Sequence, residues 1–365
     1  MKHTITFITI ALFISVICRA QDESWYKCLN GTIDKYTITM HLHKTGHTYS
    51  GYYFYNSKEE PVYFFGEDTT NKGKINLFAF PKSTEPTDEK FLFEQNGSKF
   101  TGEWKKNDSG KAYVFSAVEL NDTSLIPFSF VYAHGETKLK PALKESPVAT
   151  FEAASVWPTN NSSKALFVKK IISNELTQKN VVREPEDIFL EEKNQFSRDY
   201  KEGYKDTEDS MMRENPYLFS MDEINHLMIV YQSSKILSLA NYSYAYTGGA
   251  HGNYGTHYSS LDLENGKKIL LDNILTPTAK TKLPLLLEKY FRKNYGVEKN
   301  TSLKDAGLFE STIKPNDNFY VTGKGVNFCY TPYEIGPYVM GEINIFIPFS
   351  ELNNYLQPSF KKLVE

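Results

Sequence analysis

The feature that most constrains the fold is a series of short alternating segments in the first third of the chain, each bounded by turn residues. Residues 37–42 alternate between apolar and polar, a turn follows at Gly46, and residues 48–55 are again strand-like. Asn96-Gly97 is a strong signal for a two-residue hairpin. The pattern predicts an all-β domain over residues 21–130, a meander that curls into a small barrel or sandwich.

The N-terminus carries the pattern of a cleaved secretory signal peptide over residues 1–20. A short basic segment precedes an apolar run at residues 5–17, and Ala20 ends a plausible cleavage triplet. The run is shorter than the roughly 18 residues that a membrane span needs, and no later stretch is apolar enough to span. An exported protein, periplasmic or extracellular, is therefore predicted. A lipoprotein anchored through Cys18 is the alternative, which Ile17 disfavours because lipidation signals carry a small residue there.

The second part of the chain mixes helices and strands. Residues 131–160 contain three prolines and little periodicity, so they are predicted to be a linker. Helical spacing predicts helices over 164–176 and 185–204, and strands resume after residue 226. The sequence thus predicts an α+β module over 161–355, an antiparallel sheet with helices on one face, in halves of about 161–250 and 251–355.

Charge and cysteine content exclude several classes of function. A formal net charge of -3 gives no basic footprint, so nucleic acid is not an expected partner. Cys28 and Cys329 are expected to be free thiols rather than a disulfide. His41 and His43 would share one face of a strand beside His47, but without a carboxylate or thiol at matching spacing they favour half-exposed polar residues over a metal site.

One candidate site lies at residues 244–252, where a tyrosine-rich strand runs into two glycines and a histidine. The predicted contact residues here are Tyr246, Gly248, Gly249 and His251. In the functional interpretation, His251 donates to a partner that the glycine backbone lets approach closely. The structural interpretation, which we favour, is a bulged turn in which the glycines take positive φ and the histidine bonds a neighbouring carbonyl.

A second candidate site is the loop at residues 331–338. Pro332 and Pro337 stiffen this loop, which lowers the cost of ordering it, while Tyr333 and Tyr338 offer large amphipathic contact surfaces. The alternative is a rigid connection whose tyrosines pack on the sheet. The sequence does not choose between the two.

Several separate motifs occur in a consistent order through the second half of the chain. They are Ser238-Leu239, residues 246–251, residues 261–263 with Gly266-Lys267, residues 319–321, residues 333–338 and residues 345–352. Over about residues 160–355 they resemble the extracellular module of RsiV-type lysozyme-sensing anti-sigma factors and of PdaC-type peptidoglycan deacetylases. The resemblance implies an α+β fold, a cell-envelope setting, and a role in lysozyme contact for Pro332, Tyr333, Pro337 and Tyr338.

The chain also departs from both types. RsiV-type proteins carry a sigma-binding segment and a transmembrane helix before the module, whereas a signal peptide and a β domain precede it here. PdaC-type enzymes carry a deacetylase domain after the module, whereas this sequence ends at Glu365. We therefore expect neither signalling by that route nor deacetylation.

The hypothesis is a non-enzymatic, exported envelope protein that binds a lysozyme-like muramidase or a peptidoglycan fragment. No catalytic residue, metal or cofactor is predicted, since the sequence contains no nucleophile motif such as G-x-S-x-G. The alternatives are a wall-active hydrolase or accessory enzyme with an unrecognised site, and a purely structural envelope protein.

Overall fold

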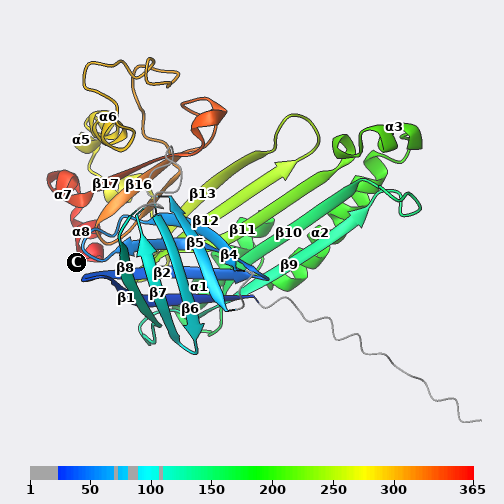
Figure 1. Cartoon of the computed structure of the whole chain (residues 1–365). Helices are drawn as coiled ribbons and strands as arrows, with labels where there is room; N and C mark the ends of the chain where they lie inside the picture. Colours follow the sequence, from blue (N-terminus) through cyan, green and yellow to red (C-terminus); the bar gives the residue numbers. More distant parts are fainter. Residues whose placement is uncertain (1–23, 70–72, 81–88, 107–109) are drawn as a thin grey trace, which may run out of the picture.

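The computed structural model describes residues 24–69, 73–80, 89–106 and 110–365. Figure 1 shows a β-barrel, in blue and cyan, packed against one end of a long sheet, with a smaller C-terminal sheet and its helices above the barrel. The expected α+β class is confirmed. The predicted signal peptide lies outside the described residues.

The first eight strands form a closed antiparallel barrel in which β1 pairs with β8. Closure confirms the predicted barrel, although β1 itself was not foreseen. The strands are β1 (Trp25–Ile33), β2 (Tyr36–Thr45), β3 (Thr48–Tyr55), β4 (Val62–Asp68), β5 (Lys74–Phe80), β6 (Glu89–Asn96), β7 (Lys99–Lys105) and β8 (Ala112–Glu119).

Alternation along each strand fills the barrel. On β6, Phe91 and Phe93 are buried in the interior while Leu92 is exposed on the outside. Gly51 allows adjacent strands to approach closely, because a Cβ built there would lie 1.9 Å from the carbonyl oxygen of His41. The barrel therefore has its own apolar core, separate from that of the sheet.

The second sheet has six strands in the order β14-β13-β12-β11-β10-β9. Its members are β9 (Phe128–Lys138), β10 (Val148–Pro158), β11 (Met221–Gln232), β12 (Ile236–Tyr246), β13 (Asn253–Asp262) and β14 (Lys267–Lys268). Neighbouring strands run antiparallel except β10 and β11, which are parallel.

The prediction of a linker over residues 131–160 is wrong, because β9 and β10 occupy most of that range. Pro141 and Pro147 lie in the connection between the two strands, and Pro158 is the last residue of β10. The prolines therefore delimit the strands rather than break them. β10 is also fully buried along its second half, so the polar–apolar alternation that signals a strand is missing there.

Helices α1 (Ser163–Thr177) and α2 (Pro185–Gly203) connect the parallel pair and match the predicted helices closely. The Ser162 side chain caps α1 by accepting a hydrogen bond from the Ala165 N–H. Both helices pack on one face of the sheet, as predicted (Figure 1). They leave the opposite face to the barrel and the C-terminal part. A short α3 (Asp209–Glu214) and η1 (Pro216–Phe219) lead into β11.

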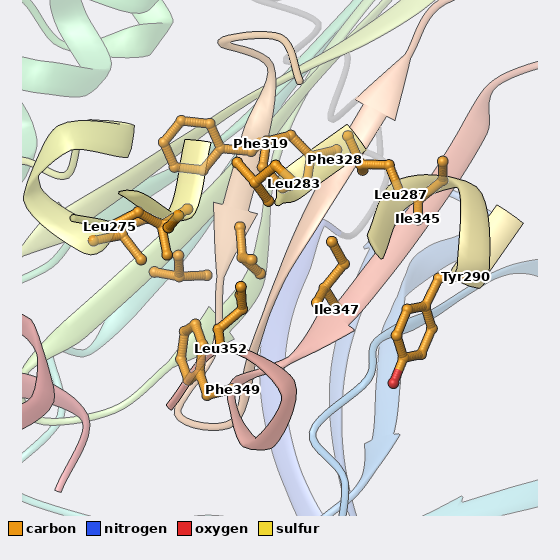
Figure 2. Packing of buried hydrophobic residues seen from close by; sticks show 14 of the residues in the cluster. Leu275, Leu283, Leu287, Tyr290, Phe319, Phe328, Ile345, Ile347, Phe349 and Leu352 are labelled. Atoms are coloured by element: carbon orange, nitrogen blue, oxygen red, sulfur yellow. The ribbon is translucent and has the colours of Figure 1, made fainter. Parts of the chain in front are cut away.

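The C-terminal part contains a three-stranded antiparallel sheet of β15 (Phe319–Val321), β16 (Gly325–Tyr330) and β17 (Ile343–Pro348). Figure 2 shows helix and sheet residues, among them Leu283, Leu287, Phe328 and Ile345, converging into its core. The remaining elements are α4 (Leu271–Ile274), α5 (Pro277–Lys280), α6 (Leu283–Asn294), η2 (Tyr338–Met340), α7 (Phe349–Leu352), η3 (Asn353–Tyr355) and α8 (Pro358–Val364). Both Cys28 and Cys329 are free, as expected.

Two histidines lie where the barrel docks on the long sheet. His41 and His43 are 0% and 1% exposed, so the prediction of half-exposed polar side chains is wrong. The Ile229 N–H on β11 donates to His43 Nε2 at 3.2 Å, and His43 Nδ1 lies 3.3 Å from the Ser50 carbonyl oxygen. These two bonds fix the neutral tautomer with the proton on Nδ1, since a carbonyl only accepts and an N–H only donates.

Candidate functional site: an aromatic cleft between barrel and sheet

A cleft of about 890 Å³ lies between the barrel, the open face of the long sheet and the C-terminal sheet. Its residues run from Thr45 in the barrel to Phe346 on β17, so all three parts of the fold contribute. Ligand pockets commonly have volumes of roughly 300–1,000 Å³. The cleft is therefore large enough for a ligand of several rings.

The floor of the cleft is formed by alternate residues of β11, β12 and β13. Ile224 pairs with Tyr244, which pairs with Tyr254, and these three side chains form one row across the sheet. The next row contains His226 and Tyr242. Because successive side chains alternate between faces, the tyrosines point away from α1 and into the cleft.

The barrel wall of the cleft carries aromatic side chains on the outside of β4 and β5. Phe65 stacks on Phe80 with centroids 5.3 Å apart and an interplanar angle of 15°, and Tyr63 stacks on Phe80 at 6.3 Å. Phe65 remains 47% exposed. Outward positions of a barrel strand are usually polar, so this row of rings marks a contact surface.

A signal for this wall was present in the sequence. Residues 63–65 and 78–80 are apolar without interruption, which leaves large rings on both faces of β4 and β5. Alternation alone assigns one face to the barrel interior and says nothing of what the other face meets.

Glu342 projects into the cleft beside the edge of β13. Its carboxylate accepts hydrogen bonds from both the N–H and the hydroxyl of Thr256, the latter at 3.1 Å. Burial raises the pKa of Glu342, an effect that the two bonds from Thr256 oppose. Its charge in turn contributes to the raised pKa values of Tyr63, Tyr242 and Tyr254. The carboxylate thus lies near aromatic rings of both the barrel wall and the sheet floor.

A second polar pair lies at the other end of the floor. His226 Nε2 is 2.8 Å from Glu152 Oε1. Burial raises the pKa of Glu152, but the hydrogen bond and charge of His226, with a contribution from His134, outweigh it, so the net pKa is lowered. Glu152 thus lies beside a histidine ring at this end of the floor.

The charge of the cleft is one-sided. Among the described residues that line it, Glu60, Glu67, Glu152 and Glu342 are acidic, and neither lysine nor arginine is present. An anionic ligand would meet repulsion here, whereas a neutral or cationic ligand would not.

The two candidate sites of the sequence come into contact with each other at the rim of the cleft. Tyr338 stacks on His251 with centroids 4.1 Å apart, and its hydroxyl donates to the Gly252 carbonyl oxygen at 2.8 Å. Tyr338 also packs edge-on against Tyr254 and lines the cleft. The turn between β12 and β13 thus meets the loop after β16, although the two are far apart in sequence.

The glycine–histidine turn has the geometry of the structural interpretation. Gly248 and Gly249 have φ of 86° and 113°, and His251 Nδ1 lies 2.9 Å from the Gly252 carbonyl oxygen. The Tyr246 hydroxyl donates to the Gly249 carbonyl oxygen at 3.2 Å. His251 therefore stacks on Tyr338 while it remains exposed to solvent.

The loop at 331–338 presents its other tyrosine to solvent. Tyr333 is 53% exposed and has a φ of 71°, a conformation that costs free energy in an aromatic residue. Its N–H donates to the Gly336 carbonyl oxygen at 3.1 Å, and Glu334 accepts from the Thr331 N–H at 3.0 Å. Pro332 precedes this turn and Pro337 leads into η2, so the loop is held rigidly.

The described part of the chain gives no indication of a bound metal. Across residues 24–69, 73–80, 89–106 and 110–365, no three His, Cys, Asp or Glu side chains gather closely enough to hold an ion. Within the same ranges, no helix is both long and apolar enough to cross a membrane.

Two family models match this chain. Residues 272–350 match the family described as protein of unknown function DUF3298, and residues 150–254 match the family described as deacetylase PdaC. The expected likeness to PdaC-type proteins is thereby confirmed for the first half of the module. The likeness to RsiV-type proteins remains a prediction.

Two solved structures are similar to part of this chain. A DUF3298 family protein from Bacteroides fragilis covers 65% of this chain and 97% of its own length, with a TM-score of 0.57 and 21% identity. That part of the chain has the DUF3298 fold. A DUF3298 family protein from Pseudomonas aeruginosa covers 64% of this chain and 95% of its own, at a TM-score of 0.44 and 17% identity. No curated protein matches the chain.

Proposed function

We propose that this protein is an exported, non-enzymatic binding protein of the cell envelope, and that its aromatic cleft binds a glycan segment of peptidoglycan type. The proposal depends on the two aromatic surfaces of the cleft. Phe65 and Phe80 form the barrel wall, and Tyr242, Tyr244 and Tyr254 lie on the floor formed by the sheet. Sugar rings present apolar C–H faces that pack flat on aromatic side chains, while their hydroxyls bond to polar groups nearby.

The polar groups of the cleft favour binding over catalysis. Glu342 accepts hydrogen bonds from Thr256, and Glu152 lies 2.8 Å from the ring nitrogen of His226. Such fixed acceptors orient the hydroxyls of a ligand. The signal-peptide pattern at residues 1–20 supports export.

Calorimetry with soluble, uncharged N-acetylglucosamine oligomers tests the proposal; muropeptides, whose carboxylates the acidic cleft repels, should bind more weakly. The double variant Phe65→Ala, Phe80→Ala should weaken binding by about 2 kcal/mol, or roughly 30-fold, because aromatic anchors dominate such contacts. Tyr217→Ala is the matched control, since Tyr217 is an exposed aromatic residue that does not line the cleft. Absence of binding by the wild-type protein at micromolar concentrations would refute the proposal.

A second candidate function is the docking of a lysozyme-like muramidase on the rim. The specific observation is an apolar tip in which Tyr333 is 53% and Val339 is 90% exposed. The RsiV-type resemblance supports the same surface. Immobilised lysozyme should retain the wild-type protein and lose the Val339→Asp variant; retention of both at equal strength would exclude this surface.

A further inference from the structure

One role of the Glu342 side chain is structural: it supplies a hydrogen-bond acceptor to the edge of β13. β13 is an edge strand over residues 254–258, so its outward backbone groups need partners. Glu342 accepts from the Thr256 N–H, and Asn318 accepts from the Tyr258 N–H at 2.9 Å and donates to the Thr256 carbonyl oxygen at 2.8 Å. The two side chains together cover this edge.

Covering the edge does not require a charge. Asn318, a neutral amide, satisfies backbone groups of the same strand edge at Tyr258 and Thr256. A desolvated carboxylate costs free energy unless a cation compensates it, and no lysine or arginine is among the described residues that line the cleft. Glu342 is only partly buried, and it lines the cleft.

The surroundings of Glu342 are suited to a cation. Tyr242 and Tyr254 lie with centroids 6.4 Å apart, and Tyr254 packs edge-on against Tyr338 at 5.6 Å. The faces of aromatic rings attract ammonium groups, and a carboxylate beside them adds a charge-assisted hydrogen bond. We propose that Glu342, Tyr242 and Tyr254 form a subsite for a protonated primary amine, supplied by an amino sugar whose nitrogen is not acetylated.

This inference rests on the proposed function and specifies the chemistry of its ligand. The test compares two oligosaccharides of equal length, one of N-acetylglucosamine and one of glucosamine, by calorimetry at a pH where the amine is protonated. The glucosamine oligomer should bind at least about tenfold more tightly, which corresponds to about 1.4 kcal/mol. Equal affinities overturn the amine subsite and leave the glycan cleft standing, whereas no binding of either sugar refutes the glycan function itself.

The Glu342→Gln variant tests whether this carboxylate carries the preference. Glutamine keeps an acceptor oxygen for Thr256, so the unfolding temperature should stay close to that of the wild type. The ratio of the two affinities should fall to about one. Glu264→Gln, an exposed glutamate outside the cleft, should keep the wild-type ratio. A preference that survives Glu342→Gln overturns the assignment.

Two further measurements test the amine subsite. If Glu342→Gln fails to fold, the wild-type preference is measured at low and high salt. A preference due to a charge pair shrinks as salt screens it, and a preference that salt does not change overturns the subsite. A lysine-rich peptide is the second measurement: if it binds while neither sugar does, the amino-sugar assignment is overturned in favour of a basic protein partner.

Discussion

His43→Gln should make the fold less sensitive to acid, because His43 is kept neutral inside the contact between barrel and sheet. Burial, together with a smaller effect of the nearby His41, lowers the pKa of His43 to about 3. Burial likewise lowers the pKa of His41 to about 3. Protonation of His43 would place a proton on Nε2, where the Ile229 N–H already donates, and would charge a group that is 1% exposed.

The magnitude follows from proton linkage. In the unfolded chain a histidine titrates near pH ~6.5, so between that pH and about 3 the unfolded state binds protons that the folded state excludes. The free energy of unfolding therefore falls, for each histidine, by about 1.4 kcal/mol for every pH unit of acidification. At pH 5 the loss for both is about 4 kcal/mol, a large part of the roughly 5–15 kcal/mol that stabilises a typical protein.

Buried glutamates act in the opposite direction. Burial raises the pKa values of Glu59, Glu60 and Glu342, so protonation of these groups stabilises the folded state as the pH falls. The pH dependence of the wild-type protein is thus a sum of opposing contributions. The difference between wild type and His43→Gln isolates the contribution of this histidine.

Urea unfolding followed by tryptophan fluorescence measures that difference. The variant keeps an acceptor for Ile229 but cannot titrate, so its stability relative to the wild type should improve by about 1.4 kcal/mol per pH unit between about pH 6 and about pH 4. His47→Gln on the same hairpin is the control, because the His47 side chain is 87% exposed. Parallel curves for the wild type and His43→Gln across this range would refute the reasoning.

Three other substitutions test further parts of the structure. Burial and the neighbouring Glu223 raise the pKa of Glu192 to about 7, so Glu192→Gln should raise the free energy of unfolding by about 1 kcal/mol at pH 8 and change it little at pH 4, measured by urea titration. Tyr333→Ala with Tyr338→Ala should weaken the binding of lysozyme to the rim by about 2 kcal/mol. Unchanged affinity for lysozyme in the folded double variant would place that contact elsewhere. Gly51→Ala should destabilise the barrel by about 2 kcal/mol or more in thermal unfolding, because its Cβ would overlap a neighbouring backbone oxygen; an unchanged melting temperature would contradict this.

Local patterns in the sequence predicted much of the fold. Strands β2 and β3 lie where alternation and the turn at Gly46 placed them, and α1 and α2 follow from apolar spacing. β10 was missed because burial on both faces removes alternation. Helices α5 and α6 remain separate, since Pro284 has no N–H to continue the first helix into the second.

The cleft could not be predicted in the same way. Its walls come from residues far apart in sequence, such as Phe65, Tyr242 and Glu342, and only the docking of barrel on sheet brings them together. Local periodicity shows which face of a strand is apolar but does not identify the partner of that face. The sequence did single out Tyr338, because aromatic residues beside prolines in a loop are informative without knowledge of long-range pairing.

The docking of the barrel has a thermodynamic consequence for any ligand of the cleft. Because one wall belongs to the barrel and the floor belongs to the long sheet, an occupant touches both and is bound only while they are docked. Occupancy and docking are therefore linked equilibria, and a ligand at 100 times its dissociation constant would stabilise the docked form by about 2.7 kcal/mol. Conversely, protonation of His43 at low pH would weaken ligand binding without any contact with the ligand. A charged His43 favours the form in which barrel and sheet are separated, and that form holds no ligand.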